Sequence, residues 1–197
     1  AADLLGDEPH RFRSEVLEFL VQHPDAAHRS CPPGHLTGSA LVVDASGTRS
    51  LLMLHRKLGR WFQPGGHADG DANLAAVALR EASEETGIAG LQVAVPAIDL
   101  DVHLVSPPGE EPHLHLDLRF LVIAAPGAQE ERNAESLALR WVDEAGLDDL
   151  DPPVDPSTRR LLHRGLAVAA ELGGGGAGGS RSRVGPRGPG WRRPASR

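Results

Sequence analysis

The sequence predicts an α/β protein, because short β-prone runs and amphipathic helices are interleaved along a single chain. Strand-like runs lie on both sides of a strongly helical segment at residues 73–86, and a second helical segment follows the last of them. The 197 residues are 40% hydrophobic and 24% charged, which is typical of a soluble globular protein with one domain of ordinary size. No stretch of about 18 apolar residues could span a bilayer.

Residues 1–36 are expected to form a helical extension at the N-terminus. Between residues 8 and 22, apolar side chains recur at helical spacing ahead of a proline that would end the helix: Phe12, Val16, Phe19 and Leu20, before Pro24. This amphipathic face is expected to pack on the main domain. The first residues show neither a basic nor an apolar leader segment, so a cytoplasmic location is expected.

The main domain is expected at residues 37–172. Its first strands are predicted at 37–43 and 50–55, because DASGTR between them is a good hairpin connection. The Gly/Pro-rich segment WFQPGGHADGDAN is predicted to be a loop, and the helix after it has Asn73 as N-cap and Gly87 at its end. Three further strands and a closing helix are predicted at 91–105, 112–124, 136–142 and 156–171.

Residues 173–197 form a Gly/Arg-rich tail that is predicted to be disordered, because it lacks the apolar side chains needed to offset its ordering entropy. The whole chain has a net charge of −7, and the tail carries six Arg and no acid. The remaining body therefore has 14 basic and 27 acidic residues, a net charge of −13. Such a body repels nucleic acid and anionic membranes and suits the recruitment of divalent cations. The tail itself could contact RNA or acidic partners, or be inert.

Three carboxylates share the apolar side of the helix at 73–86. On a helical wheel, Glu81, Glu84 and Glu85 fall in the same sector as the apolar stripe. Like charges this close repel one another and need a compensating cation, and oxygen donors at this density suit Mg²⁺ or Mn²⁺. The alternative is a solvated helix face. Gly65 and Gly66, just before the helix, favour the first interpretation because glycine lets the backbone approach a phosphate closely.

The same segment resembles the box of the Nudix hydrolases (MutT-like proteins). The matching positions, all with the family's spacing, are Gly66, Arg80, Glu81, Ala82, Glu84, Glu85, Gly87 and Ile88. One fixed position differs: Ala72 stands where the family has its first Glu, with Asp69 and Asp71 just upstream. The resemblance extends over about residues 37–150, through LLMLHRK, a Pro-Gly-Gly and a later RWV. It implies an α/β/α sandwich with a mixed sheet.

The resemblance also implies a function, a metal-dependent hydrolase that cleaves a phosphoanhydride bond in a nucleoside diphosphate-linked compound. Glu81, Glu84 and Glu85 are the implied metal ligands for Mg²⁺ or Mn²⁺, and Arg80 orients a box glutamate. The implied base is Glu81 or Glu135, since family members often have an acid shortly before the Trp of a late strand, here Trp141. The alternative for Glu135 is a plain surface glutamate. The expected partner is a small-molecule diphosphate substrate, and binding to a membrane or to a specific nucleic acid is not expected. The sequence leaves open which diphosphate is the substrate and what the oligomeric state is.

Several basic and polar residues around the loop are candidates for binding the substrate. Gly65, Gly66 and His67 could contact phosphate through the turn, and Arg56 and Lys57 at a strand end could bind phosphate by charge. A solvated strand end and a turn satisfied by His67 are the alternatives. In addition, Trp61 could stack on a base or pack behind the loop.

The alternation in PHLHLDLRF puts His113, His115 and Asp117 on one face of a strand. These three residues are interpreted either as a zinc site or as a polar wall of the substrate pocket. The single cysteine, Cys31, is expected to be a small buried side chain.

Two other functions remain open from the sequence. A catalytically impaired Nudix-fold module for ligand binding or regulation is favoured by Ala72. An isomerase on the same fold would need Cys31 as its acid, and Cys31 lies upstream of the first predicted strand.

Overall fold

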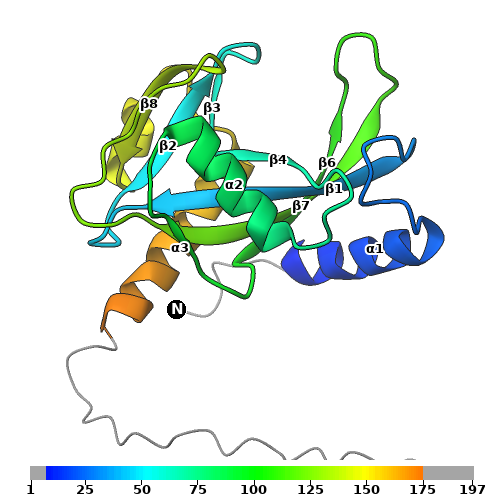
Figure 1. Cartoon of the computed structure of the whole chain (residues 1–197), viewed down its shortest axis with the longest axis horizontal. Coiled ribbons are helices and arrows are strands. Elements are labelled where there is room, and N and C mark those ends of the chain that lie inside the picture. The colour runs from blue at the N-terminus through cyan, green and yellow to red at the C-terminus, as the bar shows by residue number, and fades with distance from the viewer. Residues whose placement is uncertain (1–7, 175–197) are drawn as a thin grey trace, which may run out of the picture.

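The computed structural model describes residues 8–174 and contains an eight-stranded mixed sheet with helices on both faces (Figure 1). The strands are β1 (Gly34–Val43), β2 (Ser50–His55), β3 (Arg60–Phe62), β4 (Gly65–His67), β5 (Gln92–Val93), β6 (Asp99–Val105), β7 (His113–Ile123) and β8 (Ser136–Val142). The helices are α1 (Glu8–Gln22), α2 (Leu74–Thr86), the 3₁₀ helix η1 (Ala145–Asp149) and α3 (Pro156–Gly174). No helix among the described residues is long and apolar enough to cross a membrane.

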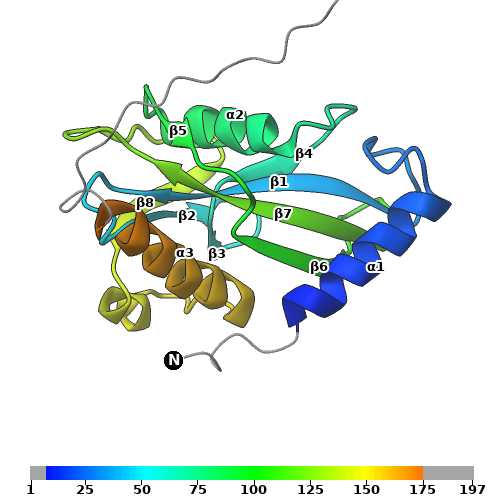
Figure 2. The ribbon, with the colours of Figure 1, turned by 90° about the horizontal axis from the view of Figure 1, so that it is seen from below.

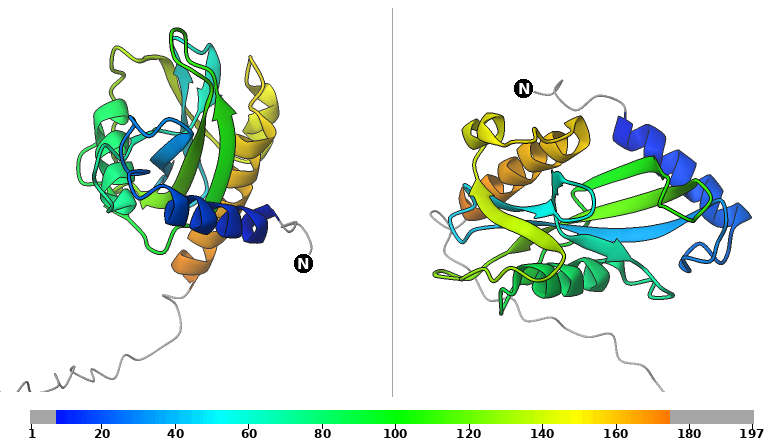
Figure 3. Two further views of the ribbon diagram at one scale, coloured as in Figure 1. Left: turned by 90° about the vertical axis from the view of Figure 1, so that its right-hand side faces the viewer. Right: turned by 90° about the horizontal axis from the view of Figure 1, so that it is seen from above.

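Strand β1 organises the sheet. It runs parallel to β7 over ten paired positions and antiparallel to β2 and β4. Strands β5 and β6 pair with β7, and β3 and β8 pair with β2. Helix α2 covers one face and α3 the opposite face, which confirms the predicted α/β/α sandwich (Figures 2 and 3). Helix α1 contacts β6, and its Val16 joins the same apolar cluster as Leu74 of α2, as expected for the N-terminal helix.

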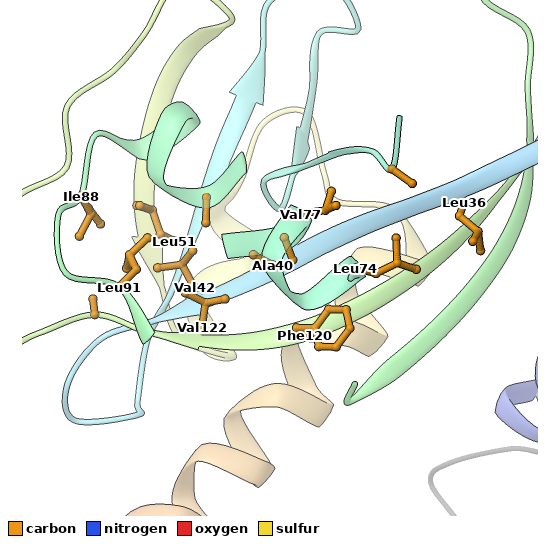
Figure 4. Close-up of a cluster of buried hydrophobic side chains, with 14 of the residues drawn as sticks. Leu36, Ala40, Val42, Leu51, Leu74, Val77, Ile88, Leu91, Phe120 and Val122 are labelled. Atoms are coloured by element: carbon orange, nitrogen blue, oxygen red, sulfur yellow. The ribbon is translucent and has the colours of Figure 1, made fainter. Parts of the chain in front are cut away.

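Helix α2 begins and ends where the sequence predicts. The Asn73 side chain accepts a hydrogen bond from the Ala76 amide at 3.3 Å, and Gly87 ends the helix at φ 68°. Leu74 and Val77 pack against Ala40, Val42 and Phe120 of the sheet (Figure 4). The close approach depends on Gly38, because a Cβ there would lie 2.7 Å from the Leu74 carbonyl oxygen.

Side chains of β1 alternate between the two faces, as a strand requires. Ala40 and Val42 belong to the core under α2, whereas Leu41 and Val43 pack with Leu161 of α3. The α3 face continues along β1 through Ser39, Thr37 and His35. The N-terminal half of β1 therefore presents polar and imidazole side chains, rather than apolar ones, on the face that α3 covers.

The structure corrects several predicted boundaries. The run at 91–105 forms two strands, β5 and β6, rather than one. Strand β1 begins at Gly34, within the segment assigned to the N-terminal extension, because the Pro33 carbonyl already accepts a hydrogen bond from the Leu114 amide of β7. The predicted loop contains β3 and β4, since glycines at 65 and 66 can pair closely with β1. Helix α3 continues to Gly174, and the rest of the predicted tail, 175–197, lies outside the described residues.

Candidate active site

Glu85 is the buried member of the carboxylates on α2, with 6% of its surface exposed. Its Oε2 accepts a hydrogen bond of 3.0 Å from the backbone amide of Gly65. Burial, together with the negative charges of Glu81, Glu135 and Glu84, raises the pKa of Glu85 to about 8, although the Gly65 bond opposes the shift. The structure therefore brings these four carboxylates into one region.

Glu81 lies directly against the glycine loop, by which we mean Gly65 and Gly66 at the start of β4 and the residues just before them. A Cβ at Gly66 would be 2.7 Å from both carboxylate oxygens of Glu81, so the carboxylate can occupy this position only beside a glycine. On its other side, the carboxylate pairs with the Arg80 guanidinium at 2.9 Å. Arg80 is thus in contact with a box glutamate in this structure.

Glu135 comes from a loop that is tied to the C-terminal end of α2. The Glu131 amide donates to the Thr86 carbonyl at 2.7 Å, and the Asn133 side chain donates to the Glu84 carbonyl at 3.2 Å. These bonds explain how an exposed side chain 50 residues after Glu85 comes near enough to influence its pKa.

Arg56 holds the other end of the same loop. Its backbone amide donates to the Glu135 carbonyl at 2.8 Å, and its Nε donates to the Ala134 carbonyl at 2.8 Å. Lys57 is exposed in the turn that follows β2. The two residues predicted to bind phosphate therefore differ in their contacts. The Arg56 side chain is hydrogen-bonded to backbone carbonyls, whereas Lys57 is exposed to solvent.

Neither upstream acid replaces the carboxylate missing at Ala72. Asp69 forms a bidentate ion pair with Arg29, and Asp71 accepts a bond of 2.8 Å from the Asn73 amide. Arg80 instead pairs with Glu81. Ala72 itself is exposed and lies two residues before the first residue of α2.

The interpretation of His113, His115 and Asp117 as one group is wrong for Asp117. Its carboxylate accepts bonds from Thr37 and Ser39 at 2.9 Å and pairs with Arg119 at 2.7 Å, so it belongs to a buried ion network. The histidines meet other rings, those of His35, His67 and His103. Sequence reasoning missed His35 and His103, because only the strand register brings them beside His115.

The structure shows that the side chains of Trp61 and Cys31 are both buried. Trp61 packs in the core under α3, and its indole nitrogen donates to the Asp151 carbonyl at 3.1 Å, so it packs behind the loop. Cys31 is 2% exposed, which confirms the expected small buried side chain.

A divalent cation fits the carboxylate group on chemical grounds. All donors are oxygens, and the mutual repulsion that raises the pKa of Glu85 is what a cation would relieve. In the part of the chain that the structure describes, Glu81, Glu84 and Glu85 do not form a set in which one carboxylate oxygen from each lies within 4.8 Å of the other two. At least one of the three side chains would therefore have to change its conformation for all three to share an ion.

Several solved structures share this fold. They include a NUDIX-family hydrolase from Clostridium perfringens, with a TM-score of 0.54 and 19% identity over 68% of this chain and 97% of that one. An Ap4A hydrolase from C. elegans has a TM-score of 0.53 and 17% identity over 71% and 98%. The NUDIX domain of Shewanella oneidensis NrtR, complexed with ADP ribose, has a TM-score of 0.51 and 16% identity over 75% and 94%.

No curated protein matches the chain in sequence. The family model of the NUDIX domain, however, matches residues 35–165, about two thirds of the chain. This match covers the sheet, α2 and about half of α3. The chain therefore belongs to the Nudix family of hydrolases, which act on phosphorus-containing anhydrides.

Proposed function

We propose that this protein hydrolyses a phosphoanhydride bond in a nucleoside diphosphate-linked small molecule, with Mg²⁺ or Mn²⁺ held by Glu81, Glu84 and Glu85. The observation that carries the proposal is the 3.0 Å bond between the Gly65 amide and Glu85. It fixes a glycine loop, which can approach phosphate, against a buried carboxylate on α2.

A cation held by Glu81, Glu84 and Glu85 would neutralise charge on the diphosphate and favour ionisation of the attacking water. The protein's own residues prepare for this. Arg80 fixes the position of Glu81 through their 2.9 Å ion pair. The Gly65 amide fixes the position of Glu85 through its 3.0 Å hydrogen bond.

Removal of a proton from the attacking water falls to a carboxylate in this group. Glu135 is the better candidate, because it is exposed and its loop is bonded to the end of α2, whereas Glu81 is engaged by Arg80. Arg56 supports this role indirectly by binding the backbone on either side of Glu135.

Substrate choice is open between compounds that share the diphosphate. The Ap4A hydrolase and the ADP ribose complex among the structural relatives supply two probes, diadenosine tetraphosphate and ADP ribose. The test is a panel of such compounds assayed for phosphate or monophosphate release with Mg²⁺, with Mn²⁺ and with chelator. We expect cation-dependent release from at least one member, absent in Glu84→Gln.

A ligand-binding module is the second candidate, favoured by Ala72 at the position of the family's first Glu. In that case, calorimetry would detect binding of a panel compound while no product formed with either cation. Turnover of any panel compound by the wild-type protein, lost in Glu84→Gln, would exclude this alternative.

A further inference from the structure

Five histidine rings gather at one end of the sheet, on the face that also carries Asp117. We call them the histidine cluster: His35, His67, His103, His113 and His115. The His35 ring centroid lies 4.9 Å from those of His67, His113 and His115, and His103 lies 5.6 Å from His115. Ten histidines occur in the chain, so half of them meet here.

The cluster is built by strand register rather than by sequence proximity. His35 of β1 lies opposite His115 of β7, and His115 lies opposite His103 of β6. His113 precedes His115 by two positions and therefore shares its face. His67 enters from β4, where it pairs with Thr37 of β1. Four strands thus contribute rings to one place.

Three of these residues have the spacing of metal ligands. One nitrogen from each of His35, His113 and His115 lies within 4.8 Å of the other two. Zinc binds imidazole nitrogen at about 2.0–2.1 Å, which in a tetrahedron separates two ligands by about 3.3 Å. Small rotations of the rings would close the remaining difference.

The buried ring nitrogens lack other partners. Both nitrogens of His35 and Nε2 of His115 are buried without a hydrogen bond, and His35 is only 2% exposed. Buried polar atoms in native proteins almost always have a partner, so three such atoms in one cluster call for a bound species.

The protonation state and the supporting contacts suit metal binding. Burial above all, with the neighbouring rings, lowers the pKa of His35 to about 4 and that of His115 to about 3, which leaves both rings neutral at physiological pH. The His113 Nδ1 bonds the Glu111 carbonyl oxygen at 2.9 Å, which leaves Nε2 for an ion. A backbone carbonyl commonly orients metal-binding histidines in this way.

We propose that His35, His113 and His115 form a second metal site, specific for a transition-metal ion such as Zn²⁺, with His67 as the adjacent fourth ring. Its all-nitrogen donors differ from the oxygen donors of Glu81, Glu84 and Glu85, which suit Mg²⁺. The two sites lie on opposite faces of the sheet, because Gly66 faces Glu81 and the next residue, His67, faces the cluster. An ion here would fix the end of β4 beside the glycine loop.

The test is a titration of metal-free, full-length protein with Zn²⁺ in millimolar Mg²⁺, which keeps the carboxylate site from competing. We expect one equivalent to bind with raised melting temperature, and Co²⁺ to give the visible absorption of a tetrahedral nitrogen site. His35→Gln and His115→Gln are each expected to weaken binding by at least roughly a hundredfold, since even outer-sphere partners of such ligands contribute 10–100-fold. Circular dichroism would verify that each variant is folded.

Matched controls identify the residues responsible. His163→Gln removes a half-exposed histidine paired with Glu144 on α3, and it should leave Zn²⁺ binding unchanged. His23, Asp25 and Cys31 form the other potential ligand group among the described residues, so Cys31→Ser is the second control. Loss of binding in Cys31→Ser, or retained affinity in folded His35→Gln and His115→Gln, would overturn the assignment. Failure of the wild type to bind Zn²⁺ or Co²⁺ would do so as well.

Discussion

The backbone amide of Gly65 donates a 3.0 Å hydrogen bond to Oε2 of Glu85, and this contact joins the glycine loop to the carboxylate face of α2. The bond joins two parts of the proposed site, the glycines that are expected to approach phosphate and the carboxylates that are expected to hold a cation. Because Glu85 is buried beside other acids, its ionisation and the binding of a cation are coupled.

Replacement of Glu85 by Gln should lower turnover on an accepted diphosphate substrate by roughly two orders of magnitude or more, as expected for loss of a main electrostatic stabiliser. Gln keeps the side-chain oxygen that accepts from Gly65, so the fold should persist. Steady-state kinetics at saturating Mg²⁺ measures the effect, and circular dichroism checks the fold. Near wild-type rates would mean that Glu85 is not a metal ligand.

The pH dependence of stability should report the same residue. The pKa of Glu85 rises from its ordinary 4.5 to about 8 in the folded protein, so the unfolded chain releases this proton at lower pH than the folded one does. Without divalent cation, the contribution of Glu85 to the free energy of unfolding should be full below about pH 4.5 and decline up to about pH 8. Urea melts of wild type and Glu85→Gln at several pH values measure it.

Glu171→Gln, which alters an exposed carboxylate on α3, is the matched control for that series. It should retain the wild-type decline, whereas Glu85→Gln should reduce it. An identical pH dependence in wild type and Glu85→Gln would contradict the raised pKa.

Gly66→Ala should displace Glu81, because the added Cβ would lie 2.7 Å from both of its carboxylate oxygens. Because the overlap is with the far end of a flexible side chain, Glu81 can move aside at little cost in stability, and the expected effect is reduced turnover. Gly173→Ala is the control, since a Cβ there meets nothing within 4 Å. Comparable activity of Gly66→Ala and wild type would show that the position of Glu81 is not critical.

Arg119→Met should be strongly destabilising. This guanidinium is 4% exposed and pairs with Asp117 at 2.7 Å, Asp101 at 3.1 Å and Asp99 at 3.5 Å. Removing one partner of a buried ion pair typically costs about 3–5 kcal/mol, because the remaining charge is left uncompensated.

The comparison for Arg119 is Arg159→Met, which breaks the ion pair of Arg159 with the exposed Asp148 and should cost less than about 1 kcal/mol. Denaturant unfolding of both variants gives the two values. Equal effects of the two substitutions would mean that the buried network adds no stability of its own.

Ala72→Glu restores the residue that the family has at this position. Arg80 is already held by Glu81, so the added carboxylate has no vacant role in orienting it. The rate should change by less than about tenfold, or roughly 1.4 kcal/mol of barrier. Side-by-side kinetics of the two proteins decide the matter, and a gain of a hundredfold or more would favour the binding module as the function of the native chain.

The sequence by itself determined the features that depend on neighbours along the chain. The caps at Asn73 and Gly87 and the period of α2 are local, so helical geometry places them without knowledge of the fold. The box spacing identified the family for the same reason. The N-terminal helix at 8–22 likewise has the predicted bounds.

Only the tertiary structure decided which distant segments meet. Asp117 joins Arg119 rather than the neighbouring histidines, Asp69 joins Arg29, and Glu135 reaches α2 through a loop bonded to Glu84 and Thr86. The meeting of His35 with His115 follows from the parallel register of β1 and β7. A strand's sequence tells which side chains share a face, but not which residue of another strand lies opposite, because register is set by pairing and packing across the whole sheet.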